Sequence, residues 1–327
     1  MNEGGFIQMK NQPTNFFLEK GKSVGKKRFE KEKKSYEEII GQGEGEVNAW
    51  IQEAQVEISA ERETLVQEVL LVAQKVVNQF SGREVVLQRD QIVAVQTGTL
   101  GSIFSNESTE GEMEKIVGHT FDNLQKVAVE VGVETSNLEL ALVLFHELMH
   151  LGSFSRIRFT NKPSHPVLGN FKPERNGLSI LDDDGDAKFF KYLDEALTEK
   201  LARKYIEGQR KNPLYAKDLA LREELFPGAV SGTYVNYEES GDGEKNPVLA
   251  EMYPRELQAT DDFVHRLYLQ NQERFSNEDE VWNIFFEAKF TGKLLKLARL
   301  IEKTEGKGLF RILGEQSNIS QTERDRE

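Results

Sequence analysis

The chain has 327 residues, of which 38% are hydrophobic and 30% charged, with a formal net charge of −13 and no cysteine. The missing cysteine excludes disulfide scaffolds and zinc sites built on thiolates, and the acidic balance argues against general nucleic-acid binding. The length predicts one large or two ordinary domains, and no stretch resembles a membrane span or a signal peptide, so we expect a cytoplasmic protein.

The N-terminal part is predicted to begin with a mobile arm, because residues 1–25 mix Gly, Asn, Lys and Gln without periodicity. From Lys20 to Lys34, eight Lys or Arg stand against two Glu, so this stretch carries about +6 and the remainder about −19. A solvated helical face explains such a run, and docking on an acidic surface or polyanion is the alternative. Apolar spacing predicts helices over 47–58 and 63–80, and strand follows at 84–96.

A hairpin and a long helix are predicted next. Residues 115–121 and 126–131 have the composition of two strands joined by a short turn. Ser136 with Glu139 three residues later forms a capping box, which predicts that a helix begins there. The strongly apolar run that follows ends at Gly152.

The second half of the chain alternates polar turns with amphipathic segments. Residues 177–181 and 188–192 flank the acidic segment 182–186, which is interpreted as a hairpin turn because its register does not fit a calcium loop. Residues 195–207 are amphipathic, and 261–313 are predicted to be mostly helical.

The residues that carry chemistry are His146-Glu147-Leu148-Met149-His150, inside the helix that Ser136 caps. Residues four apart share one helical face, so both imidazoles can reach a single ion. Two neutral imidazoles suit zinc and leave room for a third ligand and a water molecule. Glu147 lies to the side, where its carboxylate can take a proton from that water. Chance produces this motif in about one such chain in a hundred, so a third ligand is needed as support.

A candidate third ligand lies farther along the chain. Positions 154 and 156 are Phe and Arg, so neither of the close spacings used by sites with three histidines is present. In Asp194-Glu195-Ala196-Leu197-Thr198-Glu199, the two glutamates are one helical turn apart on the same face. One carboxylate can bind the metal while the other accepts the spare N–H of a ligating histidine.

Together the two motifs resemble those of the gluzincins, the thermolysin-like zinc metallopeptidases, over roughly residues 115–210. The resemblance implies an α+β, zincin-like fold, in which a small mixed or antiparallel sheet packs on the motif helix and on a second, Glu-bearing helix. It implies one catalytic Zn²⁺ with three protein ligands, His146, His150 and Glu195. Glu147 would be the general base, and Glu199 would support a ligating histidine. Asp194 departs mildly from the family, which more usually has Asn or Gly before the third ligand.

The family also implies a substrate-binding edge strand and an oxyanion donor. The strand at 126–131 directly precedes the motif helix, so we expect it to pair with the peptide through Lys126, Val127, Ala128 and Val129. The alternative is that this strand belongs to an ordinary core hairpin. The donor in this family is a His or a Tyr. His265 is the candidate chosen here, and three others stay open: Tyr205, His165 and Tyr253. His119 is expected to be an ordinary core or surface residue.

The function predicted from these residues is zinc-dependent hydrolysis of peptide bonds in peptides or proteins. The alternative is a non-hydrolytic zinc-binding regulatory or interaction protein on the same fold. Hydrolysis is favoured because structural zinc sites close with four protein ligands and only three are found. A further hypothesis makes the N-terminal helices an inhibitory cover. The predicted parts are a mobile arm (1–25), an N-terminal helical segment (26–81), the catalytic core (82–210), a helical C-terminal subdomain (211–315) and a disordered tail (316–327).

Overall fold

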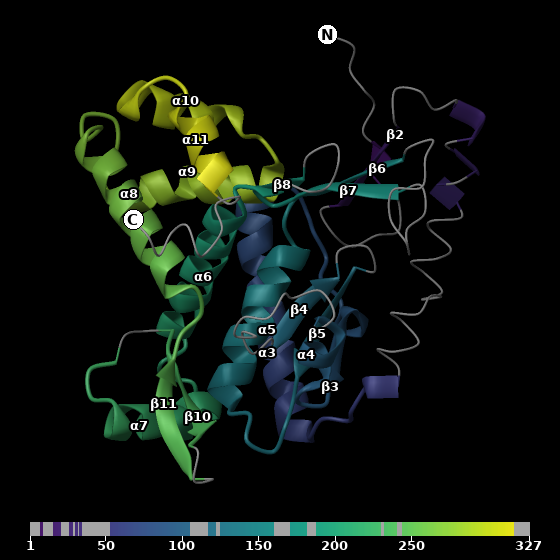
Figure 1. The fold of residues 1–327 in the computed structure, drawn as a ribbon, viewed down its shortest axis with the longest axis vertical. Coiled ribbons are helices and arrows are strands. Elements are labelled where there is room, and N and C mark those ends of the chain that lie inside the picture. Colours follow the sequence, from purple (N-terminus) through teal and green to yellow (C-terminus); the bar gives the residue numbers. More distant parts are fainter. Residues whose placement is uncertain are drawn as a thin grey trace.

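A computed structural model gives the fold of most of the chain (Figure 1). The residues that it describes are 7–8, 16–20, 26–28, 30–31, 33–34, 53–104, 117–121, 125–159, 171–181, 188–229, 232–240 and 244–316. The fold is mixed α+β, as the sequence predicts. Among the described residues, no helix combines the length and the hydropathy needed to cross a bilayer. The predicted tail and the acidic segment 182–186 lie outside the described residues, apart from Gln316.

Helix α5 (Asn137–Leu151) is the central element, and almost all of its residues are buried. The hydroxyl oxygen of Ser136 accepts a hydrogen bond from the amide of Glu139 at 3.0 Å, so the predicted start of this helix is confirmed. Helices α3 (Ala60–Ser81) and α6 (Lys191–Gly208) flank it, and a three-stranded sheet covers another side (Figure 1). An apolar helix is stable only when its neighbours cover it, which explains this arrangement.

Helix α3 is part of the hydrophobic core and not a separate N-terminal segment. Leu65, Val69 and Val77 are fully buried in the same cluster as the residues of α5. The predicted boundary at residue 81 therefore does not separate two packed units. The helix predicted over 47–58 is also wrong at its end, because Gln55 makes a β-bridge with Val95.

The three-stranded sheet has the order β3 (Ile92–Val95), β5 (Lys126–Glu130), β4 (Gly118–Phe121). The predicted hairpin is confirmed, because β4 and β5 pair antiparallel. The prediction that Lys126, Val127, Ala128 and Val129 form an edge is wrong. On its other side, β5 pairs in parallel with β3, so both of its hydrogen-bonding edges are occupied. Within the described residues, β4 is the edge strand nearest to α5.

A second sheet joins the N-terminus to the middle of the chain. Its order is β1 (Ile7–Gln8), β2 (Phe16–Lys20), β6 (Ser155–Phe159), β7 (Phe171–Asn176), β8 (Ser179–Leu181), β9 (Lys188–Phe189). β2 runs parallel to β6, and Leu18 is fully buried. The prediction of a mobile arm is therefore wrong for Phe16–Lys20, because pairing along a strand edge holds this segment without any apolar periodicity.

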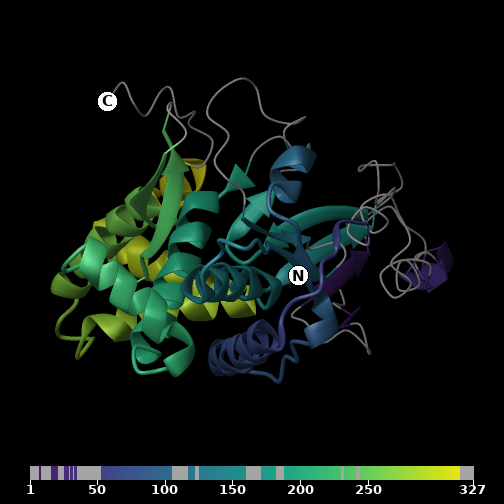
Figure 2. The ribbon, with the colours of Figure 1, turned by 90° about the horizontal axis from the view of Figure 1, so that it is seen from below.

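The C-terminal part packs on the same core as the rest of the chain. Its elements are α7 (Ala216–Leu225), β10 (Tyr234–Glu239), β11 (Lys245–Ala250), α8 (Pro254–Leu269), α9 (Glu278–Thr291), α10 (Leu295–Glu305) and α11 (Leu309–Glu315). Short helical segments complete the fold at α4 (Thr99–Phe104) and at two 3₁₀ turns. Most of the C-terminal segment, coloured green to yellow, lies on the left in Figure 2, and the purple strand β2 lies on the right. The predicted helices over 261–313 are confirmed, and one continuous core reaches from Leu65 to Ile301.

Candidate metal centre

Three donor atoms meet at one point between α5 and α6. His146 Nε2 and His150 Nε2 are 3.1 Å apart, and Glu195 Oε2 lies 3.3 Å from the first and 3.1 Å from the second. Ligand atoms held about 2.0–2.1 Å from a tetrahedral zinc ion lie about 3.3–3.4 Å from one another, so these separations fit one ion. The structure confirms that this group could hold a metal ion.

The two helices place these donors at the inner end of an opening. His146 and His150 are one turn apart on α5, and α6 packs against α5 so that Glu195 faces both rings. The side chain of His146 is 2% exposed, whereas those of His150 and Glu195 keep 11% and 13% of their surface. The donor atoms are therefore largely desolvated and still reachable from one side.

A buried carboxylate supports His150 from behind. Asp194 Oδ2 lies 3.3 Å from His150 Nδ1 and accepts from Lys289 Nζ at 2.8 Å. Its other oxygen accepts from the amide of Leu178 at 2.7 Å. The Lys289 side chain has no exposed surface. Asp194 thus orients the ring so that Nε2 faces the donor group. From the sequence, Asp194 was interpreted only as a departure from the family pattern. No pattern in the sequence predicts its ion pair with Lys289, which lies 95 residues away.

Glu199 lies behind the other histidine, as predicted from the resemblance. Its Oε2 is 3.8 Å from His146 Nδ1, which is longer than a hydrogen bond. Both atoms are buried and have no hydrogen-bond partner among the described residues. Arg203 donates to the other oxygen of Glu199 at 2.9 Å and also reaches Glu251 at 3.2 Å. The Glu199 carboxylate is therefore held in place from the side away from His146.

Glu147 is held beside the donor group by strand β4. The hydroxyl of Thr120 donates to Glu147 Oε2 at 2.6 Å. Strand β4 can approach this closely because Gly118 has no side chain. A Cβ there would lie 2.5 Å from a methyl carbon of Val143 and 3.0 Å from the Cγ of Glu147. The carboxylate of Glu147 therefore faces the same opening as the donor atoms without being one of them.

The opening is a cleft of about 420 Å³. Gly118, His119 and Thr120 from the edge strand form part of its wall, together with Tyr253. His119 was expected to be unremarkable, but the structure places it here, with its ring edge-on to Phe121 at 4.7 Å. Burial lowers the pKa of His119, so its imidazole is neutral at neutral pH. In the sequence, only the alternation of side chains along this strand bears on the position of His119. That alternation does not show which part of the molecule each face of the strand contacts.

The predicted oxyanion donor lies elsewhere. His265 is on the outside of α8, where its side chain is 58% exposed and its Nδ1 lies 3.0 Å from Glu278 Oε2. It does not line the cleft, so this prediction is wrong. Tyr205 is also excluded, because its hydroxyl pairs with that of Tyr215 at 2.6 Å inside the core. His165 lies outside the described residues.

Tyr253 is the remaining candidate, and its ring contacts that of His146. Its ring stacks on that of His146, with the centroids 5.5 Å apart and the planes 13° from parallel. Its backbone is in the left-handed region, with φ 48° and ψ 46°, directly before Pro254 starts α8. A tyrosine adopts this conformation only where its surroundings hold it there, and such positions cluster at functional sites.

Carboxylates set the charge of the two histidines. Burial lowers the pKa of His150, but the charge of Glu195 and the contact with Asp194 outweigh it and raise the pKa to about 10. Burial also opposes protonation of His146, yet Glu195 and Glu199 raise its pKa. The pKa of Glu195 lies well below its usual value, because the histidines outweigh the effect of burial. Without a metal, His150 therefore holds a proton at neutral pH.

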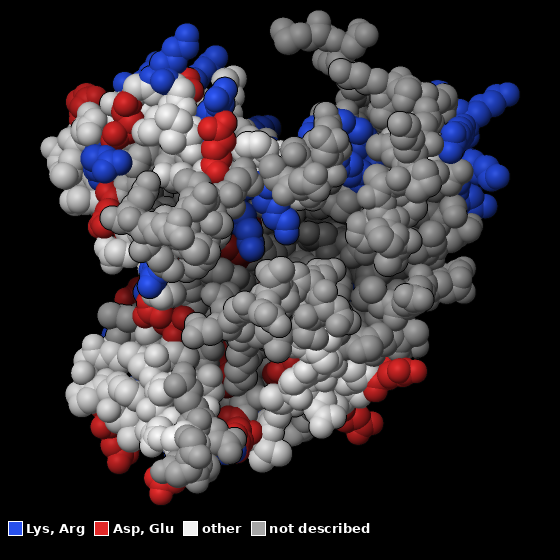
Figure 3. Space-filling model, viewed as in Figure 1, with Lys and Arg blue, Asp and Glu red and all other residues white. Residues whose placement is uncertain are grey.

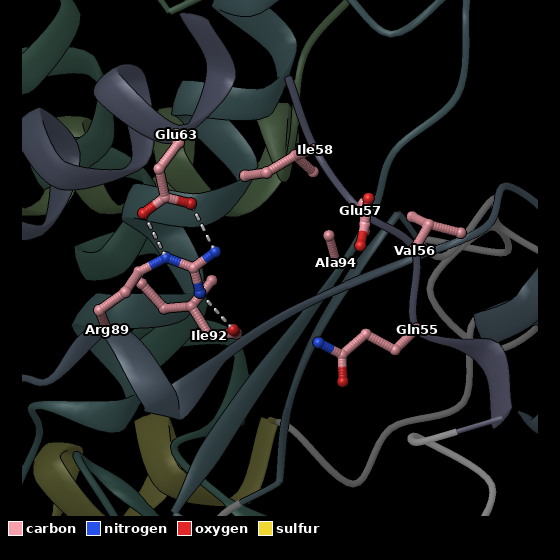
Figure 4. Close-up of a pocket in the computed structure, with 8 residues that line it drawn as sticks. All are labelled: Gln55, Val56, Glu57, Ile58, Glu63, Arg89, Ile92 and Ala94. Carbon is pink, nitrogen blue, oxygen red and sulfur yellow. Dashed lines mark hydrogen bonds and ion pairs between the residues drawn. The ribbon is translucent and has the colours of Figure 1, made fainter. Parts of the chain in front are cut away.

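Another cavity, of about 510 Å³, lies beside β3 (Figure 4). The two charged side chains that pair in its lining, Arg89 and Glu63, have a structural role. The guanidinium of Arg89 binds both carboxylate oxygens of Glu63 at 2.8 Å and donates to the carbonyl of Ile92 at 2.7 Å. These bonds connect α3 to the start of β3. The only cluster of metal-binding groups within the described part of the chain is the one at His146.

No protein-family model, curated protein or solved structure matches this chain. The chemistry assigned to the cleft therefore depends on its own side chains and their geometry.

Metal binding is expected to release protons. Because the raised pKa of His150 keeps this imidazole protonated below about pH 10, and the pKa of His146 is raised as well, a metal must displace at least one proton at neutral pH. The apparent affinity for Zn²⁺ should therefore rise about tenfold per pH unit for each proton released, between pH 6 and 9. Calorimetric titration in buffers of different ionisation enthalpy measures the number of protons. Binding without proton release would contradict the charge state described above.

Replacing the buried lysine should destabilise the protein strongly. Lys289→Met removes the ammonium that pairs with the buried Asp194, and breaking a buried ion pair costs about 3–5 kcal/mol of unfolding free energy. The exposed pair of Lys296 and Glu287 provides a matched control, and Lys296→Met should cost less than about 1 kcal/mol. Urea denaturation measures both. Lys289→Met combined with Asp194→Asn should recover part of the loss, and equal losses for Lys289→Met and Lys296→Met would contradict the role of the buried pair.

Proposed function

We propose that the protein is a zinc-dependent peptide hydrolase of the gluzincin type. The observation that carries this proposal is the convergence of His146, His150 and Glu195 at the inner end of a cleft, beside a fourth side chain, Glu147, that is not a ligand. The arrangement of α5, α6 and the small sheet over them supports the zincin-like core that the resemblance implies. A site that uses three protein donors and opens to a cleft favours hydrolysis over a purely structural role.

The donor set suits zinc. Two imidazoles and one carboxylate are typical of catalytic zinc sites, and carboxylate support behind each histidine strengthens such ligands. A bound zinc ion would lower the pKa of a water molecule and polarise a substrate carbonyl. Asp194 and Glu199 would hold the two rings in the orientation that this ion needs.

Glu147 is the proposed general base. Its carboxylate faces the cleft next to the donor group, and the hydrogen bond from Thr120 fixes its orientation. A carboxylate in this position can take a proton from water and deliver it to the amine that leaves when the peptide bond breaks. Glu147 adjoins the ligand His146 in the sequence but points to the neighbouring side of the helix, so it can move protons without binding the metal.

Strand β4, and not β5, is the proposed substrate edge. Within the described residues β4 pairs only with β5, and three of its residues line the cleft: Gly118, His119 and Thr120. A peptide that adds as a further strand gains main-chain hydrogen bonds that depend little on its side chains. Such pairing would hold the scissile bond over the donor group.

Tyr253 is the proposed donor to the oxyanion. It lines the cleft and stacks on a ligand ring, whereas the other candidates that the structure describes lie away from the cleft. A phenol is a neutral hydrogen-bond donor at neutral pH, and a donor aimed at the developing negative charge stabilises the transition state more than the ground state.

Metal content and hydrolysis of a mixed-peptide library, measured on the same samples, test the proposal. We expect one zinc ion per chain in the wild type and in Glu147→Gln, because Glu147 is not a ligand. The glutamine oxygen can still accept from Thr120, so the fold should be kept. The hydrolysis rate of the variant should fall roughly 10²–10⁴-fold, the usual contribution of a general base.

The other outcomes of this experiment separate the alternatives. Zinc in both proteins with hydrolysis in neither would contradict the proposal and favour a non-hydrolytic metal-binding role. Equal hydrolysis by both proteins would remove Glu147 as the base. No metal in either protein would remove the metal centre itself.

Tyr253→Phe should lower kcat roughly 10²-fold with little change in KM, because the lost hydroxyl acts only in the transition state. The aromatic ring that stacks on His146 is kept, so the zinc content should not change. Tyr237→Phe, which alters an exposed tyrosine of β10, is the matched control. An unchanged kcat in Tyr253→Phe would exclude this residue as the donor.

A further inference from the structure

One wall of the cleft is cationic. Arg175 from β7, Lys188 from β9 and Lys191 at the start of α6 all line it. Three carboxylates in and beside the donor group also line the cleft, those of Glu147, Asp194 and Glu195, whereas the edge strand β4 and Tyr253 contribute no charge. Lys and Arg side chains border the hollow near the centre of the face shown in Figure 3. Three cations along one wall stand out in a chain with a net charge of −13.

Arg175 is a fixed positive charge. Its side chain is buried, and the guanidinium donates to the carbonyl oxygens of Gly177 and Gly292 at 2.7 Å and of Ala288 at 3.4 Å. These acceptors are neutral, and the carboxylate of Asp194 acts on the guanidinium through its charge. Burial lowers the pKa of Arg175 to about 10, so the group stays charged at neutral pH.

Lys191 adds a second positive charge, on a solvent-exposed side chain. Lys191 is the first residue of α6, and it has no ion pair with a described residue. Phe190, which precedes it, provides no side-chain cap, so the positive end of the helix dipole adds to the lysine charge. Lys188 lies three residues earlier, after the acidic segment 182–186, which is outside the described residues. Arg175 and Lys191 therefore define the cationic wall.

We propose that this wall is a subsite for a carboxylate group of the substrate. The inference rests on the proposed peptidase function and names its substrate class: peptides with a carboxylate close to the scissile bond. That carboxylate is supplied either by an acidic side chain or by a free C-terminus. A cleft of about 420 Å³ accommodates a short stretch of peptide, and a charge-assisted bond to a cationic wall would fix its register along β4.

Peptide binding to the zinc-loaded Glu147→Gln variant tests the subsite without turnover. Three peptides of otherwise equal sequence serve as probes: one with Glu beside the expected scissile bond, one with Gln there, and one with Gln there and a C-terminal amide. We expect a carboxylate to tighten binding about tenfold, and the advantage to shrink as salt is raised from 0.05 to 0.5 M. The difference in affinity between the Glu and Gln peptides measures the contribution of a side-chain carboxylate. The difference between the Gln peptides with a free and an amidated C-terminus measures the contribution of the C-terminal carboxylate.

Substitution of Lys191 in the same background identifies the wall. Lys191→Gln should remove most of the preference for the carboxylate, and Lys191→Glu should reverse it in favour of a fourth peptide that has Lys at that position. Lys217→Gln, which removes an exposed lysine of α7, is the matched control and should keep the preference. Arg175 is left intact because its bonds to three carbonyls make it part of the fold.

The outcomes distinguish this inference from the function on which it rests. If the wild type hydrolyses peptides but the variant binds all three probes equally, the carboxylate subsite is wrong and the peptidase remains. If Lys191→Gln and the control Lys217→Gln change the preference for the carboxylate by the same amount, the proposed subsite is also wrong. If the wild type hydrolyses no peptide and the variant binds none, the proposed function fails and the subsite fails with it.

Discussion

The carboxylate of Asp194 is the interaction on which the arrangement of the site depends. Its two oxygens contact three parts of the fold: the amide of Leu178 in the turn between β7 and β8, the ammonium of Lys289 on α9, and the ring of His150 on α5. A buried charge of this kind is tolerated only when all of its partners are present. The position of His150 is therefore coupled to the docking of the C-terminal helices, which explains why those helices share one core with α5.

A buried carboxylate also lies behind the other histidine, His146, but at a longer distance: Glu199 Oε2 is 3.8 Å from His146 Nδ1. Glu199 is held by Arg203, which also contacts Glu251 at the entry to α8, so the residues just before Tyr253 are tied to α6. Tyr253 then turns back in a left-handed conformation and lies on the ring of His146. The strain of that conformation is compatible with a stable fold because ion pairs and stacking hold both sides of it. Both histidine rings are thus positioned by contacts from outside the motif helix.

The cleft has two walls of different charge, and each wall suits a different part of the proposed peptide substrate. The neutral wall comes from the edge strand β4, which offers main-chain groups and a neutral imidazole, and suits a peptide backbone of any sequence. The cationic wall comes from β7, β9 and the start of α6, and suits one charged group. Affinity from the backbone and selectivity from one charge would together explain how so small a cleft could choose among peptides.

The sequence by itself determined what depends on local spacing. The four-residue spacing of His146 and His150 and the helix cap at Ser136 are short-range patterns, and the structure places both as predicted because helical geometry relates neighbouring residues directly. Only the tertiary structure decided which strand is the edge, that Lys289 neutralises Asp194, and that β2 joins the sheet. These features depend on pairing and burial between segments far apart in the chain, for which a single sequence carries no periodic signal.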